Sequence, residues 1–407
     1  MLKTHNPTRI FQAESLFEAA LNLGFPAAVW RLPHSHEVNL LISLQDGMQR
    51  RLPDLEELPA CFVIHPFEPL ESGEAFVLEG DLIFTFSEDW SCKEVAGNLG
   101  QEHPFVKRLL EKADEMSDEN PGGTSSWIGF ALNPEVDPEE KNHFEKAVTE
   151  AVAAISRGDF AKIVLSRTKT LTYSPEFQFF KAFKKLCVAY PSAFVSLVNL
   201  ADRDEMWLGA TPETLVGVNG EGTFSTTSLA GTQSALENGA LVSAHDIRWG
   251  QKEIQEQALV SRYIIECFKK IRLREYQERG PRTVRAGNLY HLRTDFAVNT
   301  HDVNFPELGT VMLKLLHPTS AVCGMPKESA LRFIKAVEGY DRSFYSGYLG
   351  PVNVDGESAL FVNLRSLRLA DGLATFFAGA GITEDSDPQR EWDETEMKCD
   401  TLLSVLR

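Results

Sequence analysis

Two pairs of glutamates have the spacing of a possible metal site. Glu253 and Glu256 stand three residues apart in KEIQEQALV. Glu391 and Glu394 repeat this spacing in EWDETEMK, and Lys398 follows at position i+7 from Glu391. Residues at positions i and i+3 of a helix share a face, so each pair would present both carboxylates to one side. Oxygen donors of this kind, without His or Cys beside them, suit Mg²⁺, which prefers carboxylates, water and substrate oxygens.

Each pair has a simpler interpretation when it is taken alone. Glutamate is common on the solvated face of a helix, and sequence spacing does not show that two helices meet. A di-iron carboxylate bundle would carry Glu-x-x-His pairs, and neither segment has that His. The sequence therefore predicts a magnesium site on the condition that the two helices pack across a common cleft.

Local patterns indicate the elements that would position these groups. A helix is predicted from Asp137, an N-cap followed by Pro, to Gly158. A second, longer helix is predicted from near Trp249 towards Arg279. Predicted strands are AKIVLSRTKTL, FVSLVNL and MWLGAT as a hairpin, SGYLGPVNV, ALFVNLRSLRLA and ATFFAGAGI, before a last helix in EWDETEMKCDTLLSVL. Strand pairs separated by long helices are typical of an α/β or α+β fold with largely antiparallel sheets.

The first third of the chain has no chemical motif. Its short apolar runs predict strands and a few helices, and the acidic stretch 112–124, which ends in Pro-Gly-Gly, is the best linker candidate. The expected division is therefore an N-terminal portion, 1–135, and a catalytic region, 136–407.

Charge and cysteine content limit the possible partners and location. With 40 Lys and Arg against 58 Asp and Glu, the formal charge of −18 disfavours nucleic acid and anionic membranes as partners. An anionic substrate would need a local concentration of Lys, Arg or metal. The six cysteines form no C-x-x-C pair, the N-terminus has no apolar leader, and no run approaches 18 apolar residues. These features favour a cytoplasmic protein.

Eight segments give the chain a resemblance to a known family. They are AKIVLSR, GATPETL, LAGT, KEIQEQALV, HPTSAVCGMPK, FVNLRS, AGAGI and EWDETEMK. Their order and approximate spacing resemble those of the chorismate-binding enzymes, which include anthranilate, aminodeoxychorismate, salicylate and isochorismate synthases. The resemblance covers about residues 140–405. It implies one large α/β domain in which two antiparallel sheets pack as a sandwich with helices outside, and residues 1–135 would join that fold.

The resemblance also implies roles for the charged groups. Glu256 and Glu394 would bind Mg²⁺ directly, Glu253 and Glu391 would hold it partly through water, and the metal would grip the ring carboxylate of chorismate. Arg365 would receive the enolpyruvyl carboxylate with its bidentate guanidinium. The other implied substrate contacts are Tyr345, Lys398, Gly379, Gly231, Thr232 and Ala321.

Three positions separate the reactions of the family. Members that use ammonia usually carry Gln at the position of Lys162, whereas members that use water carry Lys. Aminodeoxychorismate synthases often have a nucleophilic Lys where this chain has Ala230. Members that eliminate pyruvate commonly have Thr where this chain has Ala321. All three residues favour water addition without pyruvate loss, which is the reaction of the isochorismate synthases.

This reaction needs a base and an acid. Lys162 would take a proton from the water that attacks C2, and Glu213 in GATPETL would protonate the departing C4 hydroxyl. Both must be neutral before attack, and a dry pocket favours the neutral form of an acid and of a base alike. How Glu213 stays protonated does not follow from the sequence.

Two alternatives remain at this point. A salicylate synthase would share Lys162 and Glu213, and Ala321 argues against it. A non-catalytic chorismate-binding protein would be expected to lose one of the two catalytic groups. Water as the nucleophile removes the need for a glutamine amidotransferase partner, and a monomer is expected. The sequence does not reveal whether the product would supply menaquinone, a siderophore or salicylate.

Overall fold

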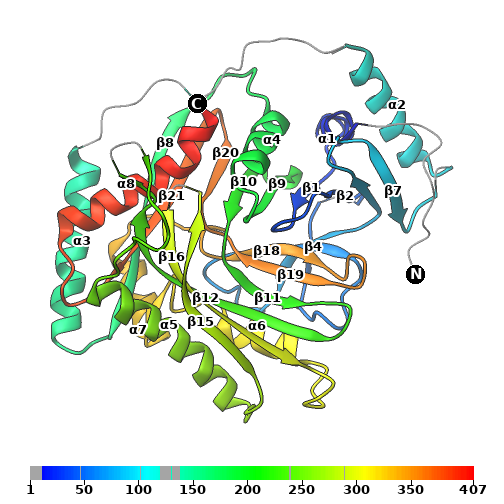
Figure 1. The fold of residues 1–407 in the computed structure, drawn as a ribbon. Coiled ribbons are helices and arrows are strands. Elements are labelled where there is room, and N and C mark those ends of the chain that lie inside the picture. The colour runs from blue at the N-terminus through cyan, green and yellow to red at the C-terminus, as the bar shows by residue number, and fades with distance from the viewer. Residues whose placement is uncertain are drawn as a thin grey trace.

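Two large antiparallel sheets form the centre of the protein (Figure 1). The structure is a computed structural model, and it describes residues 12–407 except 46, 101, 120–129, 131–137, 238–239 and 288. The ten-stranded sheet has the order β17 (Gly324–Met325), β8 (Lys162–Thr172), β21 (Leu373–Ile382), β20 (Ser366–Ala370), β10 (Glu205–Thr211), β9 (Phe194–Leu200), β1 (Ala27–Arg31), β2 (Val38–Ile42), β6 (Leu82–Phe86) and β7 (Cys92–Gly97).

The second sheet and the helices complete the described elements. The nine-stranded sheet has the order β15 (Gln277–Ala286), β16 (Leu289–Asn299), β12 (Thr223–Ser234), β11 (Thr214–Val218), β19 (Ser358–Val362), β18 (Tyr348–Val352), β4 (Cys61–His65), β5 (Ala75–Glu79) and β3 (Gln49–Arg51). A small pair is formed by β13 (Leu236–Glu237) and β14 (Ala240–Leu241). The helices are α1 (Ala13–Asn22), α2 (Pro104–Glu119), α3 (Pro138–Ser156), α4 (Phe179–Ala189), α5 (Gln251–Lys270), α6 (Leu308–Leu316), α7 (Lys327–Val337) and α8 (Pro388–Leu406).

The two sheets pack face to face through large apolar side chains. Phe194 of β9 stacks on Phe361 of β19, with ring centroids 4.2 Å apart, and Trp207 and Phe377 lie in the same buried cluster. Offset aromatic pairs of this kind add to the free energy gained by burying apolar area. In Figure 1, β11, β18 and β19 run across the direction of β10, β20 and β21. The predicted sandwich, with helices outside and as a single domain, is confirmed.

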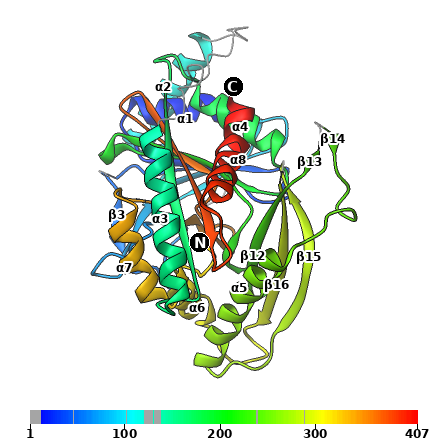
Figure 2. The same ribbon diagram turned by 90° about the vertical axis from the view of Figure 1, so that its left-hand side faces the viewer.

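The helices cover the outer faces of the sheets. Helix α5 lies on β12 and β16, and α8 lies on β21 beside α3 (Figure 2). In α5 the buried residues Val260, Tyr263, Ile264 and Cys267 recur with the helical period, which is the pattern of a helix with one apolar face. In the described part of the chain, no helix combines the length and apolarity that a membrane crossing requires.

The N-terminal third contributes strands to both sheets. β1, β2, β6 and β7 lie in the ten-stranded sheet, and β3, β4 and β5 lie in the nine-stranded one. The linker prediction for 112–124 is wrong for residues 112–119, because these belong to α2. The rest of that stretch lies outside the described residues. The acidic composition that suggested a linker therefore belongs in part to a helix.

Two other predicted elements differ in extent. The long helix ends at Lys270 rather than near Arg279, because Arg272 has a positive φ of 60° and residues 277–286 form β15, which pairs with β16. The stretch ALFVNLRSLRLA forms two strands in different sheets, β19 and β20. The chain turns between them at Arg365, which has a φ of 46°. The predicted helix near 138–156, strand β8, hairpin β9–β10, strands β18 and β21 and helix α8 are confirmed; Asp137 lies outside the described residues.

Candidate active site

Two crossings of the chain between the sheets position Glu213 and Arg365. Glu213 follows β10 of one sheet and precedes β11 of the other, and Arg365 lies between β19 and β20. The crossings are tied together, because the Val362 amide donates to the Glu213 carbonyl at 3.0 Å and the Ala210 amide donates to the Arg365 carbonyl at 3.0 Å. Both side chains line one cavity. Two residues far apart in sequence are thereby held at the same cavity.

Lys162 lies below this cavity at the start of β8. Its side chain is fully buried, and Nζ donates to Glu256 Oε1 at 2.9 Å. The neighbouring strand β21 leaves room for this pair because it carries glycine at 379 and 381, opposite Ser166 and Val164. A Cβ at Gly381 would collide with Glu256 Oε1 and come within 3.2 Å of Lys162 Cε. Gly381 of AGAGI therefore makes space for the Lys162–Glu256 pair, and Gly379 makes space for the Tyr345 hydroxyl.

A histidine that the sequence reasoning missed orients Arg365. His291 on β16 is buried, its Nδ1 lies 2.7 Å from the Gly231 carbonyl, and its Nε2 contacts Arg365 Nη2. Burial, followed by the Arg365 charge, holds the pKa of His291 well below its usual value. The neutral ring therefore donates from Nδ1 and accepts from the guanidinium at Nε2. Arg365 Nη1 donates to the Ala286 carbonyl at 3.0 Å, so the guanidinium is fixed from two sides.

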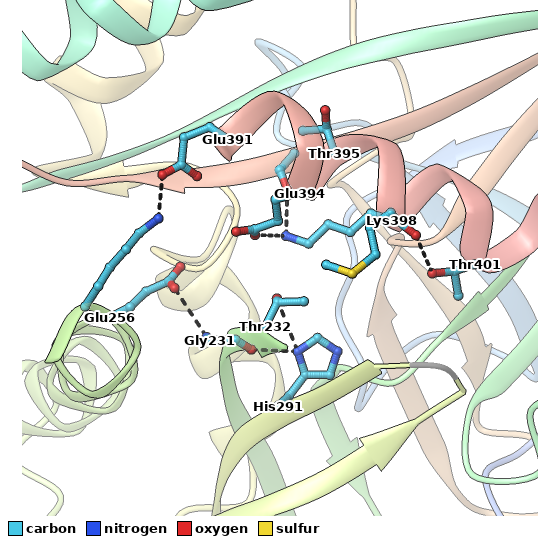
Figure 3. A network of polar contacts seen from close by, with 12 residues as sticks. Gly231, Thr232, Glu256, His291, Glu391, Glu394, Thr395, Lys398 and Thr401 are labelled. Carbon is cyan, nitrogen blue, oxygen red and sulfur yellow. Dashed lines mark hydrogen bonds and ion pairs between the residues drawn. The ribbon is translucent and has the colours of Figure 1, made fainter. Parts of the chain in front are cut away.

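The predicted metal-binding helices do face each other. Figure 3 shows Glu391, Glu394 and Lys398 of α8 opposite Glu256 of α5 and Gly231 of β12. Glu391 is one of the buried residues of α8, in line with Thr395 and Cys399 one and two turns later. Glu256 likewise precedes the buried Val260 of α5 by one turn. A carboxylate near the N-terminus thus continues the inward stripe of each helix, which explains why Glu256 and Glu391 do not lie on a solvated face.

Each of three carboxylates is paired with a lysine. Glu256 pairs with Lys162, Lys252 Nζ lies 2.5 Å from Glu391 Oε1, and Lys398 Nζ lies 2.7 Å from Glu394 Oε1. Lys398 also donates to the Gly379 carbonyl at 2.7 Å. Within the described ranges, no three His, Cys, Asp or Glu side chains form a ready metal cluster. Three lysines thus face three of the four carboxylates predicted to hold the metal.

The donor chemistry of these residues nevertheless fits a hard cation. Glu391 Oε2 is buried and has no hydrogen-bond partner among the described residues. Burial raises the pKa of Glu391 despite Lys252. Burial also opposes ionisation of Glu256, but Lys162, Lys398 and Lys252 outweigh it and lower its pKa. Glu253 lies beside this group, because a Cβ at Gly231 would come within 3.0 Å of its Cβ. Carboxylate oxygens of this kind are the ligands that Mg²⁺ prefers.

Most of the predicted site residues share the cavity. Its lining includes Glu213, Gly231, Thr232, Glu256, Ala321, Tyr345, Arg365, Gly379 and Lys398. Lys162, Glu253, Glu391 and Glu394 do not line it and stand behind or beside residues that do. The lining residues that sequence reasoning missed are Val164, Pro212, Leu229, His291, Val322, Ser346, Leu364, Phe377, Ala378 and Gly381. Nearly all of these lie next to a predicted motif, whereas His291 lies far from any.

The structure supplies a reason for Glu213 to stay protonated. Burial raises the pKa of Glu213 to about 8, and the nearby Lys162 and Arg365 charges only partly offset this effect. Desolvation disfavours the charged form of a carboxyl group, and a fully buried group can be shifted by several units. At neutral pH the side chain is therefore mostly a neutral acid with a proton to give.

This shift predicts a pH-dependent cost in stability. The unfolded chain ionises Glu213 near its ordinary pKa of 4.5, whereas the folded protein holds the proton to about 8. Stability is therefore lost as the pH rises from 4.5 to 8 and not below that window. We expect Glu213→Gln to melt at the same temperature as the parent near pH 4.5 and at a higher temperature at pH 8, as measured by calorimetry. An equal melting temperature at both pH values would mean that Glu213 is solvated.

Comparison with known proteins identifies the family of this chain. The chain belongs to the family of chorismate binding enzymes, whose family model matches residues 92–407. Isochorismate synthase EntC of Escherichia coli (strain K12) is 30% identical over 268 residues, which are 65% of this chain and 67% of that protein.

Solved structures share the fold at lower identity. The menaquinone-specific isochorismate synthase of Escherichia coli has a TM-score of 0.74 at 20% identity, covering 100% of this chain and 95% of that chain. Anthranilate synthase component I of Streptococcus pneumoniae TIGR4 has a TM-score of 0.65 at 21% identity, covering 99% and 100%. Enzymes with different names share this fold, so the reaction must be argued from the site.

Proposed function

We propose that the protein is an isochorismate synthase, which interconverts chorismate and isochorismate by adding water at C2 and releasing the C4 hydroxyl. The observation that carries the proposal is the buried Glu213, whose pKa burial raises to about 8, in one cavity with Arg365 and near Lys162. The arrangement provides an acid and an anion-binding guanidinium that line one cavity, with a buried lysine beside it. The similarity to isochorismate synthase EntC supports the same reaction.

The cavity has the charges that a dianionic substrate needs in an acidic protein. Arg365, fixed by His291 and the Ala286 carbonyl, would bind the enolpyruvyl carboxylate through its fork of donors. Lys398, next to the Gly379 carbonyl, would approach the ring carboxylate. Tyr345, Gly231, Thr232 and Ala321 would complete the walls.

Three residues favour water over the other reactions of the family. Lys162 offers a base where ammonia-using members usually carry Gln. Ala230 and Ala321 both line the cavity, and neither has a nucleophilic or hydroxyl group. The alanine at 230 leaves no covalent nucleophile, and the alanine at 321 removes the hydroxyl common in members that eliminate pyruvate. Salicylate synthase therefore remains the less favoured alternative.

Mg²⁺ would bind between α5 and α8. We propose Glu256 and Glu394 as direct ligands, with Glu253 and Glu391 holding the ion partly through water. The buried oxygen of Glu391 without a partner among the described residues, and the all-oxygen donor set, support this assignment. When bound, the ion would supply positive charge for the ring carboxylate.

Side chains of this protein carry out the proton transfers. With Lys162 as the neutral amine, released from its ion pair with Glu256, its Nζ takes a proton from the water that forms the new C2–O bond, the ring double bonds shift, and Glu213 protonates the C4 hydroxyl as its C–O bond breaks. Atoms balance, because one water is added and one is released. In the reverse direction Glu213 is the base and Lys162 the acid, by microscopic reversibility. Positioned acid–base groups of this kind contribute about 10²–10⁴ in rate.

Product analysis tests the proposal. Purified protein given chorismate and Mg²⁺, with no ammonia, should produce isochorismate, and isochorismate should return chorismate to the same final ratio on chromatography. Pyruvate should be absent. Salicylate with an equal amount of pyruvate would establish the salicylate synthase reaction instead, and no turnover would favour a chorismate-binding protein without catalysis.

Three further expectations belong to this proposal. Residues 136–407 carry the catalytic groups, and the described strands β1–β7 within residues 1–135 complete the sheets. A reaction with water needs no glutamine amidotransferase partner, and the monomer suffices because every proposed site residue comes from one chain. The six free cysteines are compatible with the cytoplasm as the location.

A further inference from the structure

The strand that carries Lys162 lies near the edge of its sheet and loses its neighbour after two residues. β17 pairs with β8 only at Lys162 and Ile163. The Val164 amide still reaches the Cys323 carbonyl at 2.8 Å. Beyond this point the outer edge of β8 has no partner strand in the described chain. Unpaired amides and carbonyls of an edge strand must be satisfied by other groups when they are buried.

A buried ion pair supplies these missing hydrogen bonds. Arg342 Nη2 donates to the Val164 carbonyl at 2.8 Å, and the Ser166 amide donates to Glu338 Oε1 at 2.7 Å. The two side chains therefore continue the ladder of β8 where β17 ends. Ser166 Oγ also donates to Glu338 Oε1, at 3.0 Å. The edge of the strand is thus held by side chains rather than by backbone.

The pair is almost inaccessible to water. The side chains of Glu338 and Arg342 are each 2% exposed. Arg342 Nε donates to Glu338 Oε2 at 2.8 Å, and Nη2 donates to Oε1 at 2.5 Å. The guanidinium also lies over the Phe67 ring, 4.3 Å from its centroid. Burying two charges costs several kcal/mol of desolvation, so such a pair is weak evidence for stability by itself.

The groups that the pair holds form the wall of the cavity. Arg342 Nη1 donates to the Val322 carbonyl at 2.8 Å, and the Tyr345 amide donates to the Arg342 carbonyl at 2.9 Å. Val164, Val322 and Tyr345 all line the cavity. Lys162 precedes Val164 by two residues on the same strand, so both side chains point to the same face. The Arg342 guanidinium therefore connects the base strand to the wall beside Ala321, and the Arg342 backbone carbonyl holds the turn before Tyr345.

We propose that Glu338 and Arg342 are positioning residues, which act as a brace that holds Lys162 and the wall around Val322 in the geometry for reaction. Neither Glu338 nor Arg342 lines the cavity. The activity readout of this inference rests on the proposed function. Small displacements matter here, because a misplacement of about 1 Å can cost about 10²-fold in rate.

Conservative substitutions of Arg342 and Glu338 test whether the geometry of the brace matters separately from its charge. Arg342→Lys keeps the positive charge but loses the fork that reaches Val164, Val322 and Glu338 together. Glu338→Asp keeps the negative charge but withdraws the oxygen from Ser166. We expect each variant to fold and to lower kcat by about 10–100-fold, with little change in KM for chorismate. Glu338→Gln, which removes the charge, should lower kcat by at least as much.

Glu205 provides a matched control. Its side chain is 1% exposed and pairs with Arg368 at 2.5 Å on strands β10 and β20, and it does not line the cavity. Glu205→Gln and Glu338→Gln should both lower the melting temperature. Glu205→Gln, however, should leave kcat of the folded fraction unchanged. Melting curves, taken with kcat measured well below the melting temperature, distinguish lost positioning from lost folding.

The outcomes are distinct. A kcat of Arg342→Lys and Glu338→Asp within twofold of the parent, in folded protein, would overturn the brace. The brace would also be overturned if the activity lost by the Glu338 and Arg342 variants matched their unfolded fraction, as is expected for Glu205→Gln. If Glu338→Gln does not fold, the two conservative variants decide. Failure of the proposed function itself looks different, because the parent would then make no isochorismate at all.

Discussion

Replacing Lys162 by alanine is expected to lower kcat for chorismate conversion by about 10²–10⁴-fold. The change removes the group that takes the proton from water, while Arg365 and Lys398 remain to bind the substrate. Binding of chorismate, measured by calorimetry on the inactive variant, should persist. Lys169 is a matched control, because it lies on the same strand, pairs with Glu396 at 2.7 Å and does not line the cavity. Lys169→Ala should keep normal turnover.

Glu213→Gln is expected to cause a loss of the same order, because the departing C4 hydroxyl is then released without a proton. In the parent, kcat for chorismate should fall as the pH rises above about 8, where Glu213 loses its proton. Each variant should be impaired by the same factor in both directions, since an enzyme cannot move the equilibrium. Near-normal turnover of Lys162→Ala would remove the reason for assigning water as the nucleophile.

Loss of a metal ligand is the second large effect. Glu256→Gln and Glu394→Gln are each expected to abolish most turnover at limiting Mg²⁺, because each removes a charged oxygen that would bind the ion directly. Chelation by EDTA should stop the parent enzyme, and added Mg²⁺ should restore it. Calorimetry without substrate should show Mg²⁺ binding to the parent and much weaker binding to both variants.

Glu396 controls for the charge of helix α8. It lies on the same helix and pairs with Arg167 and Lys169 rather than facing α5. Glu396→Gln should leave Mg²⁺ binding unchanged. Parent-like Mg²⁺ affinity and activity in both Glu256→Gln and Glu394→Gln would contradict the proposed metal site. These carboxylates would then serve only in ion pairs with lysines.

Local patterns in the sequence predicted most elements of the fold but not where they end. The apolar period of α5 and the β-branched residues of β8 are properties of neighbouring residues, so they can be recognised directly. The end of α5 depends on the left-handed Arg272 and on the pairing of β15 with β16. The break between β19 and β20 depends on which sheet each strand joins. Neither feature has a local signal strong enough to be recognised in advance.

The site could be predicted where the resemblance named its motifs. Glu213, Arg365 and Glu256 do line one cavity, although sequence spacing alone gave no evidence that their elements meet. The raised pKa of Glu213 depends on burial, which the sequence does not contain. His291 belongs to none of the motifs and strands predicted from the sequence, and Glu338 contacts Ser166 from 172 residues away. Contacts between such distant residues follow only from the packed structure.

Conversion of chorismate in water enriched in heavy oxygen tests the central claim most directly. With Mg²⁺ present, the isochorismate formed should carry one heavy oxygen, in its ring hydroxyl, because water supplies that atom. Chorismate that re-forms in the reverse reaction should in turn carry heavy oxygen at its C4 hydroxyl. Isochorismate without heavy oxygen would contradict activation of water by Lys162, and salicylate with pyruvate would contradict the assigned reaction.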